Sequence, residues 1–167
     1  MRMKNKKSIL CIAAHPDDEA LGLGGTLIKH SKIGDEVNIL IMSDGEAAKN
    51  NKSQKDYKRI HKAKEWCNET NCNLYKVFDF PDQKFDTIPR LEIIQKIELV
   101  LKDVLPDIVY IHHLGDLNLD HSISSLSTIT ALRPMTKLEK KCEIRAFETP
   151  SSTEQAPNIG QFQFKPN

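Results

Sequence analysis

Short apolar runs alternate with longer segments of helical periodicity along this chain. Five runs have the length of buried strands: residues 8–14, 37–42, 74–80, 108–112 and, more weakly, 142–147. Between them, apolar residues recur every three or four positions in four segments: 20–32, 53–69, 89–105 and 120–132. Regular alternation of strand and helix predicts an α/β fold, with a parallel sheet covered by helices on both faces.

Composition narrows the class of protein. The 167 residues suffice for one domain with a substantial core, and 28% charged with 39% hydrophobic residues is ordinary for a soluble globular chain. The formal net charge of +1 gives no reason to expect a nucleic-acid partner. No run approaches the ~20 apolar residues of a membrane span, and the apolar run after the basic start is too short for a signal peptide. We therefore expect a cytoplasmic protein without membrane insertion.

Three polar clusters follow predicted strands. They cover residues 15–19, 43–46 and 112–121. Because the carboxyl ends of parallel strands meet at one edge of a sheet, and ligands bind there, we expect these clusters to gather around one site.

The first cluster carries more charge than a helix start needs. One acid would complement the helix N-terminus, yet His15 is followed by Asp17, Asp18 and Glu19. His15 and Asp18 lie three residues apart at a turn, so both can face one point. Neutral imidazole and carboxylate are ligands of Zn²⁺, and the metal would offset the crowded charge. A third ligand must then come from another strand end.

The stretch "HHLGDLNLDH" offers that ligand in His121. Its plainer interpretation is an ordinary loop, with solvent-facing histidines and with Asp120 capping the next helix. The presence of the first cluster favours the metal-site interpretation.

Two motifs carry a family resemblance. "AHPDDEALGLGGTL" and "GDLNLDH" resemble the two signatures of the LmbE-like, or PIG-L, family of zinc-dependent N-deacetylases. Shorter matches run through the chain in order: "SDGE", "DFPDQKFDT", "RP" and "FETPSSTE".

The resemblance implies a Rossmann-like three-layer αβα fold, in which zinc is held by two histidines and one aspartate. The matching positions here are His15, Asp18 and His121, and Asp17 matches the general base of the family. The implied reaction is hydrolysis of an N-acyl group, usually N-acetyl, on an amino sugar. The implied partner is a small N-acetylated sugar or nucleotide sugar.

One position departs from the family pattern. Many members carry a histidine three residues before the last zinc ligand, where this chain has Asn118. Asparagine can donate a hydrogen bond to the acyl oxygen but cannot deliver a proton. The leaving amine must then be protonated by another group, and Asp17, His113 and Asp116 are the candidates.

Further residues are expected to contact substrate, against the simpler alternative that they form turns or face solvent. They are Asp44, Glu46, Arg59, Asp82, Asp116 and Arg133. By contrast, we expect Gly22, Gly24 and Gly25 to allow close helix packing, and Trp66 and Phe85 to serve as core or cover.

We expect residues 1–150 to form the catalytic domain and 151–167 to form a loop-like segment. Family members usually continue for several dozen residues beyond such an ending, so we expect zinc binding to be retained and turnover to be weak. Two other functions stay open. One is a deacetylase-like domain that binds without turnover. The other is a receiver-type signalling domain, with Asp79 as phospho-acceptor, although no lysine closes the last strand. The sequence does not identify the sugar, and it does not decide whether the protein forms a homo-oligomer.

Overall fold

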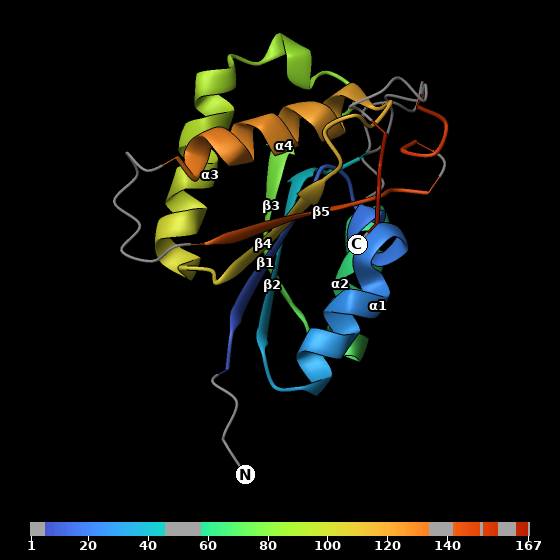
Figure 1. The fold of residues 1–167 in the computed structure, drawn as a ribbon, viewed down its shortest axis with the longest axis vertical. Helices are drawn as coiled ribbons and strands as arrows, with labels where there is room; N and C mark the ends of the chain where they lie inside the picture. The colour runs from blue at the N-terminus through green and yellow to red at the C-terminus, as the bar shows by residue number, and fades with distance from the viewer. Residues whose placement is uncertain (1–5, 46–57, 134–141, 151, 157–162, 167) are drawn as a thin grey trace.

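The computed structural model describes residues 6–45, 58–133, 142–150, 152–156 and 163–166, and its ribbon is shown in Figure 1. Five parallel strands form one sheet in the order β3-β2-β1-β4-β5. The strands are β1 (Ser8–Ala13), β2 (Glu36–Ser43), β3 (Asn73–Phe80), β4 (Ile108–His112) and β5 (Glu143–Phe147). The helices are α1 (Asp18–Lys32), α2 (Lys58–Thr70), α3 (Arg90–Val104) and α4 (Leu119–Ala131), with a 3₁₀ turn at Phe85–Thr87.

The predicted three-layer α/β fold is confirmed. Helices α1 and α2 cover one face of the sheet, and α3 and α4 cover the other (Figure 1). Successive side chains of the central strand β1 enter opposite halves of the core, as strand geometry requires. Leu10 and Ile12 pack toward α3 and α4, whereas Ile9 and Cys11 pack toward α1 and α2.

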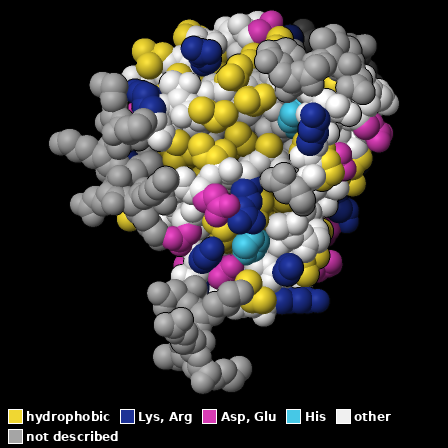
Figure 2. All heavy atoms as spheres, viewed as in Figure 1, with side chains coloured by type: hydrophobic (Ala, Val, Ile, Leu, Met, Phe, Trp, Pro, Cys, Tyr) yellow, Lys and Arg dark blue, Asp and Glu magenta, His cyan; other side chains and the backbone are white. Residues whose placement is uncertain are grey.

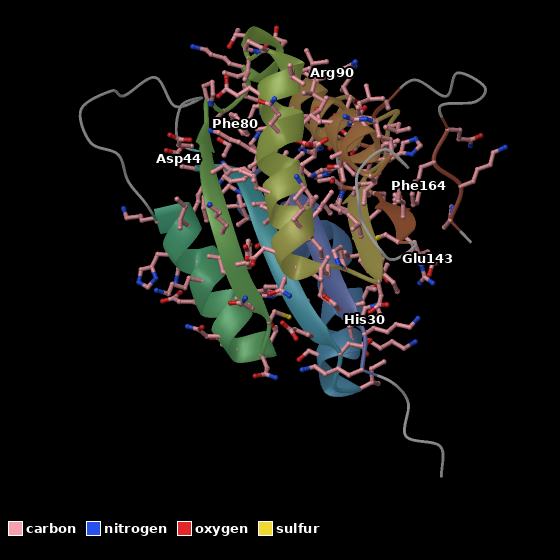
Figure 3. All side chains as sticks on the ribbon, turned by 90° about the vertical axis from the view of Figure 1, so that its left-hand side faces the viewer. His30, Asp44, Phe80, Arg90, Glu143 and Phe164 are labelled. Atoms are coloured by element: carbon pink, nitrogen blue, oxygen red, sulfur yellow. The ribbon has the colours of Figure 1, made fainter. Side chains whose placement is uncertain are left out.

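The chain order places a crevice at the carboxyl end of the sheet. From β1 the chain moves outward to β2 and β3, and it then crosses back to β4 and β5. The order reverses between β1 and β4, which is the position where open α/β sheets bind ligands. Figure 3 shows Asp44 and Phe80 toward this end, and His30 toward the opposite end.

Two packing details differ from the sequence expectation. Leu91 belongs to the apolar positions that recur with helical spacing in 89–105, which predicts that it is buried, but it is 62% exposed, and Ile93 is fully buried instead. A Cβ on Gly22 would lie 2.5 Å from the Glu148 carbonyl oxygen, so this glycine does allow close packing. Gly25 has no such neighbour within 4 Å, and the packing expectation for it is wrong.

Strand β5 lies at the edge of the sheet, and a partly apolar surface adjoins it. Leu126 and Ile129 of α4 and Ile144 of β5 are exposed, and Figure 2 shows hydrophobic side chains gathered on the face where α4 and β5 lie. Among the described residues, no helix has the length and apolar character needed to cross a membrane. The cytoplasmic location and the absence of a nucleic-acid partner stay predictions.

Candidate active site

The turn after β1 separates two neighbouring carboxylates. Asp17 has φ 107°, in the left-handed region that only a few per cent of non-glycine residues adopt. The turn closes when the His15 N–H donates to Asp18 Oδ2 at 2.9 Å. As a result, the Asp18 side chain is only 7% exposed, while the Asp17 side chain is 51% exposed. One carboxylate therefore belongs to a buried cluster, and the other faces the surface where substrate can arrive.

Three ligand atoms converge on that buried cluster. Asp18 Oδ2 lies 3.4 Å from His15 Nδ1 and 3.3 Å from His121 Nε2. Ligands bound tetrahedrally at about 2.0–2.1 Å from a zinc ion lie about 3.3–3.4 Å from each other. One ligand atom from each of the three residues falls within 4.8 Å of the others. The donor set and its spacing therefore fit a zinc ion with an open fourth position.

Carboxylates on the far side of each imidazole fix the two rings. His15 Nε2 lies 3.0 Å from Asp120 Oδ2 and 3.1 Å from Asp82 Oδ1. His121 Nδ1 lies 3.2 Å from Asp116 Oδ1. Such carboxylate–histidine contacts set the tautomer and orientation of metal-binding histidines. Asp82 and Asp116, expected to contact substrate, are buried behind the histidines and support them.

A second group, formed by His15, Asp82 and Asp120, also has metal-binding spacing. The oxygens of Asp120, however, accept backbone N–H groups from Gln83 at 2.7 Å and Phe85 at 3.0 Å. Both oxygens of Asp120 thus accept backbone N–H groups, whereas among the described residues only Oδ2 of Asp18 accepts one, which favours the group formed by His15, Asp18 and His121 as the candidate metal site.

The beginning of α4 is capped by Asn118. Its side-chain oxygen accepts the Asp120 N–H at 3.0 Å, so the plainer interpretation, in which Asp120 caps this helix, does not hold. With its oxygen used in the cap, the amide of Asn118 can act on a substrate only through its NH₂ group.

His112 is a buried neighbour of the cluster for which the sequence analysis predicted no role. Its Nε2 accepts the Ala14 N–H at 2.9 Å, and its Nδ1 lies 3.0 Å from Thr149 Oγ1, so neither nitrogen is available to a metal. Burial lowers the pKa of His112 to about 3, and the ring stays neutral. It stacks on His121 with centroids 3.9 Å apart. His112 therefore forms a rigid support for the ring of His121. Its place at the end of a buried strand is the feature of the sequence that could have indicated this role.

Arg59 of α2 joins two strand-end turns. Its guanidinium donates to the carbonyl oxygens of Gly45 at 2.9 Å and Pro16 at 3.0 Å, and to Asp17 Oδ2 at 2.9 Å. Arg59 was expected to contact substrate, and the structure places it as a clamp on the exposed carboxylate. The clamp also explains why the left-handed conformation of Asp17 is tolerated, since surrounding contacts must hold such a residue.

Buried charges in the cluster reinforce each other. Burial disfavours charged imidazole, yet contacts with Asp120, Asp18 and Asp82 outweigh it and raise the pKa of His15 to about 11. The pKa of His121 rises to about 9 because Asp116 and Asp18 outweigh its burial. The same contacts with His121 and His15 hold the pKa of Asp18 well below its usual range despite burial. A proton on a ligand nitrogen of His15 or His121 would have to leave before that nitrogen could bind a metal cation.

Not all expected site residues lie at this cluster. Arg133 follows the far end of α4, twelve residues and so about 18 Å along the helix from His121, and it pairs with Glu98 at 3.2 Å. His113 is half-buried, with its ring 5.3 Å from that of Phe164. Asp44 lies at the end of β2, half-buried at the rim (Figure 3). Glu46 lies outside the described residues.

The segment after β5 contributes to the site. Asp116 Oδ2 accepts hydrogen bonds from Ser152 Oγ at 3.0 Å and Thr153 Oγ1 at 2.5 Å. These residues belong to the segment expected to be loop-like, and they hold the carboxylate that supports His121. The division of the chain at residue 150 stays a prediction.

Fold and site together define a three-layer α/β protein with a His/Asp cluster at the carboxyl edge of a parallel sheet. The family described as PIG-L, GlcNAc-PI de-N-acetylase, matches residues 10–132, about three quarters of the chain. The chain belongs to this family, as its two motifs predicted. The receiver-type alternative is therefore wrong, and its phospho-acceptor candidate Asp79 is 91% exposed beside Lys96.

Similar proteins include deacetylases and one enzyme with another reaction. A diacetylchitobiose deacetylase from Thermococcus kodakarensis is 51% identical over 39 residues, which is 23% of this chain and 15% of that protein. The structure of N,N'-diacetylchitobiose deacetylase from Pyrococcus horikoshii matches with a TM-score of 0.73 at 22% identity, over 87% of this chain and 61% of that one. The 4-carboxy-2-hydroxymuconate hydratase of Pseudomonas putida matches with a TM-score of 0.73 at 23% identity, over 90% and 68%.

This chain thus spans less than two thirds of the length of the two diacetylchitobiose deacetylases. Because a deacetylase and a hydratase share the fold, the reaction must be argued from the site.

Proposed function

We propose that this protein is a zinc-dependent N-deacetylase that removes an acetyl group from an N-acetylated amino sugar or a conjugate of one. The observation that carries the proposal is the convergence of His15 Nδ1, Asp18 Oδ2 and His121 Nε2 beside the exposed carboxylate of Asp17. Family membership and the two diacetylchitobiose deacetylases support this reaction over others on the same fold.

His15, Asp18 and His121 would hold the zinc ion. When bound, zinc supplies a Lewis acid that polarises an acyl oxygen and lowers the pKa of water. Asp82, Asp120 and Asp116 keep the two imidazoles oriented for this task.

Asp17 is the general base. It is adjacent to a metal ligand, half-exposed, and held by the guanidinium of Arg59 at 2.9 Å. Its carboxylate takes a proton from the attacking water as the new C–O bond forms. Arg59 fixes the carboxylate in place, so little reorganisation is needed when the reaction occurs.

The Asn118 NH₂ group donates to the acyl oxygen as negative charge develops there. The leaving nitrogen then needs a proton as the C–N bond breaks. Asp116 already accepts hydrogen bonds from Ser152 and Thr153 and contacts His121, and the His113 ring packs against Phe164. We therefore favour Asp17, which returns to the leaving nitrogen the proton that it took from water. The products are acetate and a free amine.

Two substitutions at the adjacent aspartates test the proposal. Asp17→Asn is expected to keep zinc and lose ~10²–10⁴ of turnover, the usual contribution of a general base. Asp18→Asn is expected to lose zinc itself. Zinc content is measured by mass spectrometry, and amine release is followed with N-acetylglucosamine and N,N'-diacetylchitobiose. Asp79→Asn, at an exposed position outside the cluster, is the matched control and should match wild type.

A wild-type protein that takes up no zinc would overturn the metal assignment. Turnover by Asp17→Asn at the wild-type rate would overturn the role of the base. Zinc binding without amine release from any N-acetylated sugar would instead identify a deacetylase-like binding domain.

A further inference from the structure

An open pocket of about 560 Å³ lies between the start of α1 and the face of α2. It begins at Pro16 and Asp17 and runs along α2 past Arg59 and Ala63 to Trp66. Its size falls within the range of small-molecule sites, about 300–1,000 Å³. The proposed reaction uses Asp17 and the Arg59 that holds it, and it gives no role to the part of the pocket that extends to Trp66.

The floor of the pocket is apolar and contains one aromatic side chain. Pro16, Ala20, Ala63 and Trp66 line it. Trp66 is half-buried and rests against α1, where a Cβ on Gly24 would lie 3.4 Å from its Cζ2. Such a large, rigid ring offers a flat apolar surface, and the C–H face of a sugar ring can stack on it.

The residues that line the pocket carry charges of both signs. Its basic residues are Lys58, Arg59 and Lys62, and its acidic residues are Asp17, Glu19, Glu65 and Glu69. Lys62 pairs with Glu65 at 2.7 Å, and Arg59 pairs with Asp17. The balance gives a phosphate or pyrophosphate no net attraction, whereas it offers a neutral hydroxyl group both donors and acceptors.

Glu19 adds a second observation. Its side chain is fully buried, and its Oε2 accepts the Asp17 N–H at 3.1 Å. Its Oε1 has no hydrogen-bond partner among the described residues. Buried polar atoms nearly always have a protein or solvent partner. Because Oε1 is closed off from bulk solvent, a ligand in the open pocket would complete this group only through a bridging water.

The spacing of the two ends indicates the size of the ligand. Trp66 follows Arg59 by seven residues, two helical turns, so it lies about 10 Å farther along α2. A sugar whose acetyl group reaches Asp17 would not also cover Trp66. A second ring joined to it would.

We propose that the pocket between Asp17 and Trp66 binds a second, uncharged sugar ring, so that the substrate is an N-acetylated oligosaccharide and not a nucleotide sugar. This inference rests on the proposed deacetylase function, because it extends the substrate of that same site.

Trp66 is the only tryptophan of the chain, so its fluorescence reports on the pocket directly. Three probes are titrated in the presence of a chelator, which prevents turnover: N,N'-diacetylchitobiose, N-acetylglucosamine and UDP-N-acetylglucosamine. We expect a saturable change with the disaccharide, and binding at least tenfold weaker (~1.4 kcal/mol) for the other two. Equal affinity for the disaccharide and the monosaccharide, or tightest binding of the nucleotide sugar, would overturn the inference.

Calorimetry of variants gives a second measurement. Trp66→Ala is expected to weaken disaccharide binding about tenfold, and Trp66→Phe, which keeps a smaller ring and guards against a folding defect, less than that. Lys64→Ala, exposed on α2 outside the pocket lining, is the matched control and should bind as wild type does. Wild-type affinity in Trp66→Ala would contradict the inference.

The two proposals can fail separately. A Trp66 response to the disaccharide without amine release from the zinc-loaded protein would contradict the deacetylase function alone. Amine release from the disaccharide with the same KM in wild type and Trp66→Ala would contradict the pocket alone.

Discussion

Replacement of the buried acid Glu19 by glutamine is expected to stabilise the protein in a pH-dependent way. Burial raises the pKa of Glu19 from 4.5 to about 7, because the charged carboxylate would lie in the core without full hydrogen bonding. Glutamine has nearly the same shape and can still accept the Asp17 N–H, but it never ionises. The substitution therefore isolates the penalty of ionisation.

The sign and size of the effect follow from the pKa difference. Between pH 4.5 and about 7, the folded state binds more protons at Glu19 than the unfolded state does, so the free energy of unfolding falls as pH rises. A difference of about 2.5 pKa units corresponds to about 3 kcal/mol. Glu19→Gln should match wild type near pH 4.5 and exceed it by up to that amount at pH 7.5.

Urea unfolding at the two pH values, with a chelator present, measures this difference. The raised pKa values of His15 and His121, about 11 and 9 against 6.5 for a free imidazole, lower stability as pH rises above 6.5, and this loss is common to both proteins. The exposed Glu36→Gln is the control and should change little at either pH. The same stability gain for Glu19→Gln at pH 4.5 and 7.5 would refute ionisation as its cause.

Three further predictions concern the site. Zinc uptake at neutral pH should release about two protons, one each from His15 and His121, so the apparent affinity for zinc should fall by up to about 100-fold for each pH unit that the pH is lowered. Zinc titrations in buffers of different ionisation enthalpy measure the number of protons released. A zinc affinity that does not change with pH would contradict this prediction. Gly45→Ala should reduce turnover while zinc content stays unchanged. The new Cβ would lie 2.8 Å from Nη1 of Arg59, and the backbone at this position has a left-handed φ of 69°, so the substitution should displace the guanidinium that holds Asp17. Wild-type kinetics in this variant would show that the clamp is not needed. Asn118→Asp should keep the helix cap and lose ~10²–10³ of kcat as the oxyanion donor disappears, and an active, folded variant would exclude that donor role.

The alternation of apolar runs was sufficient to predict the fold. Strands β1, β2 and β4 are buried on both faces, and such strands appear in sequence as continuous apolar runs bounded by polar residues. The limit of the pattern shows in α3, where Leu91 and Ile93 are both apolar. Apolarity alone does not say which of them meets the sheet, and the structure buries only Ile93.

The candidate site was predictable where its residues are close in sequence. His15 and Asp18 share a turn, and His121 was expected at a second strand end. Contacts between side chains that are distant in sequence could not be predicted in this way. Arg59 bonds to Pro16 across 43 residues, and Asp82 meets His15 from the loop after β3. Both were expected to face substrate, because a local pattern shows a polar residue near the site without showing what it contacts.

Asp17 and Asp18 show how far sequence can separate chemically identical groups. The letters "DD" present two equal carboxylates. The three-residue spacing from His15 pointed to Asp18 as a ligand, and family resemblance gave Asp17 the role of base. The structure gives the physical reason. The left-handed φ of Asp17 turns its side chain outward, while the turn that this conformation closes directs Asp18 back to the His15 N–H. A backbone conformation that is unfavourable in isolation is held by Arg59 from a different helix. The division of labour between the two acids is therefore a property of the assembled fold, and any change that releases the clamp should impair the base before it impairs the metal.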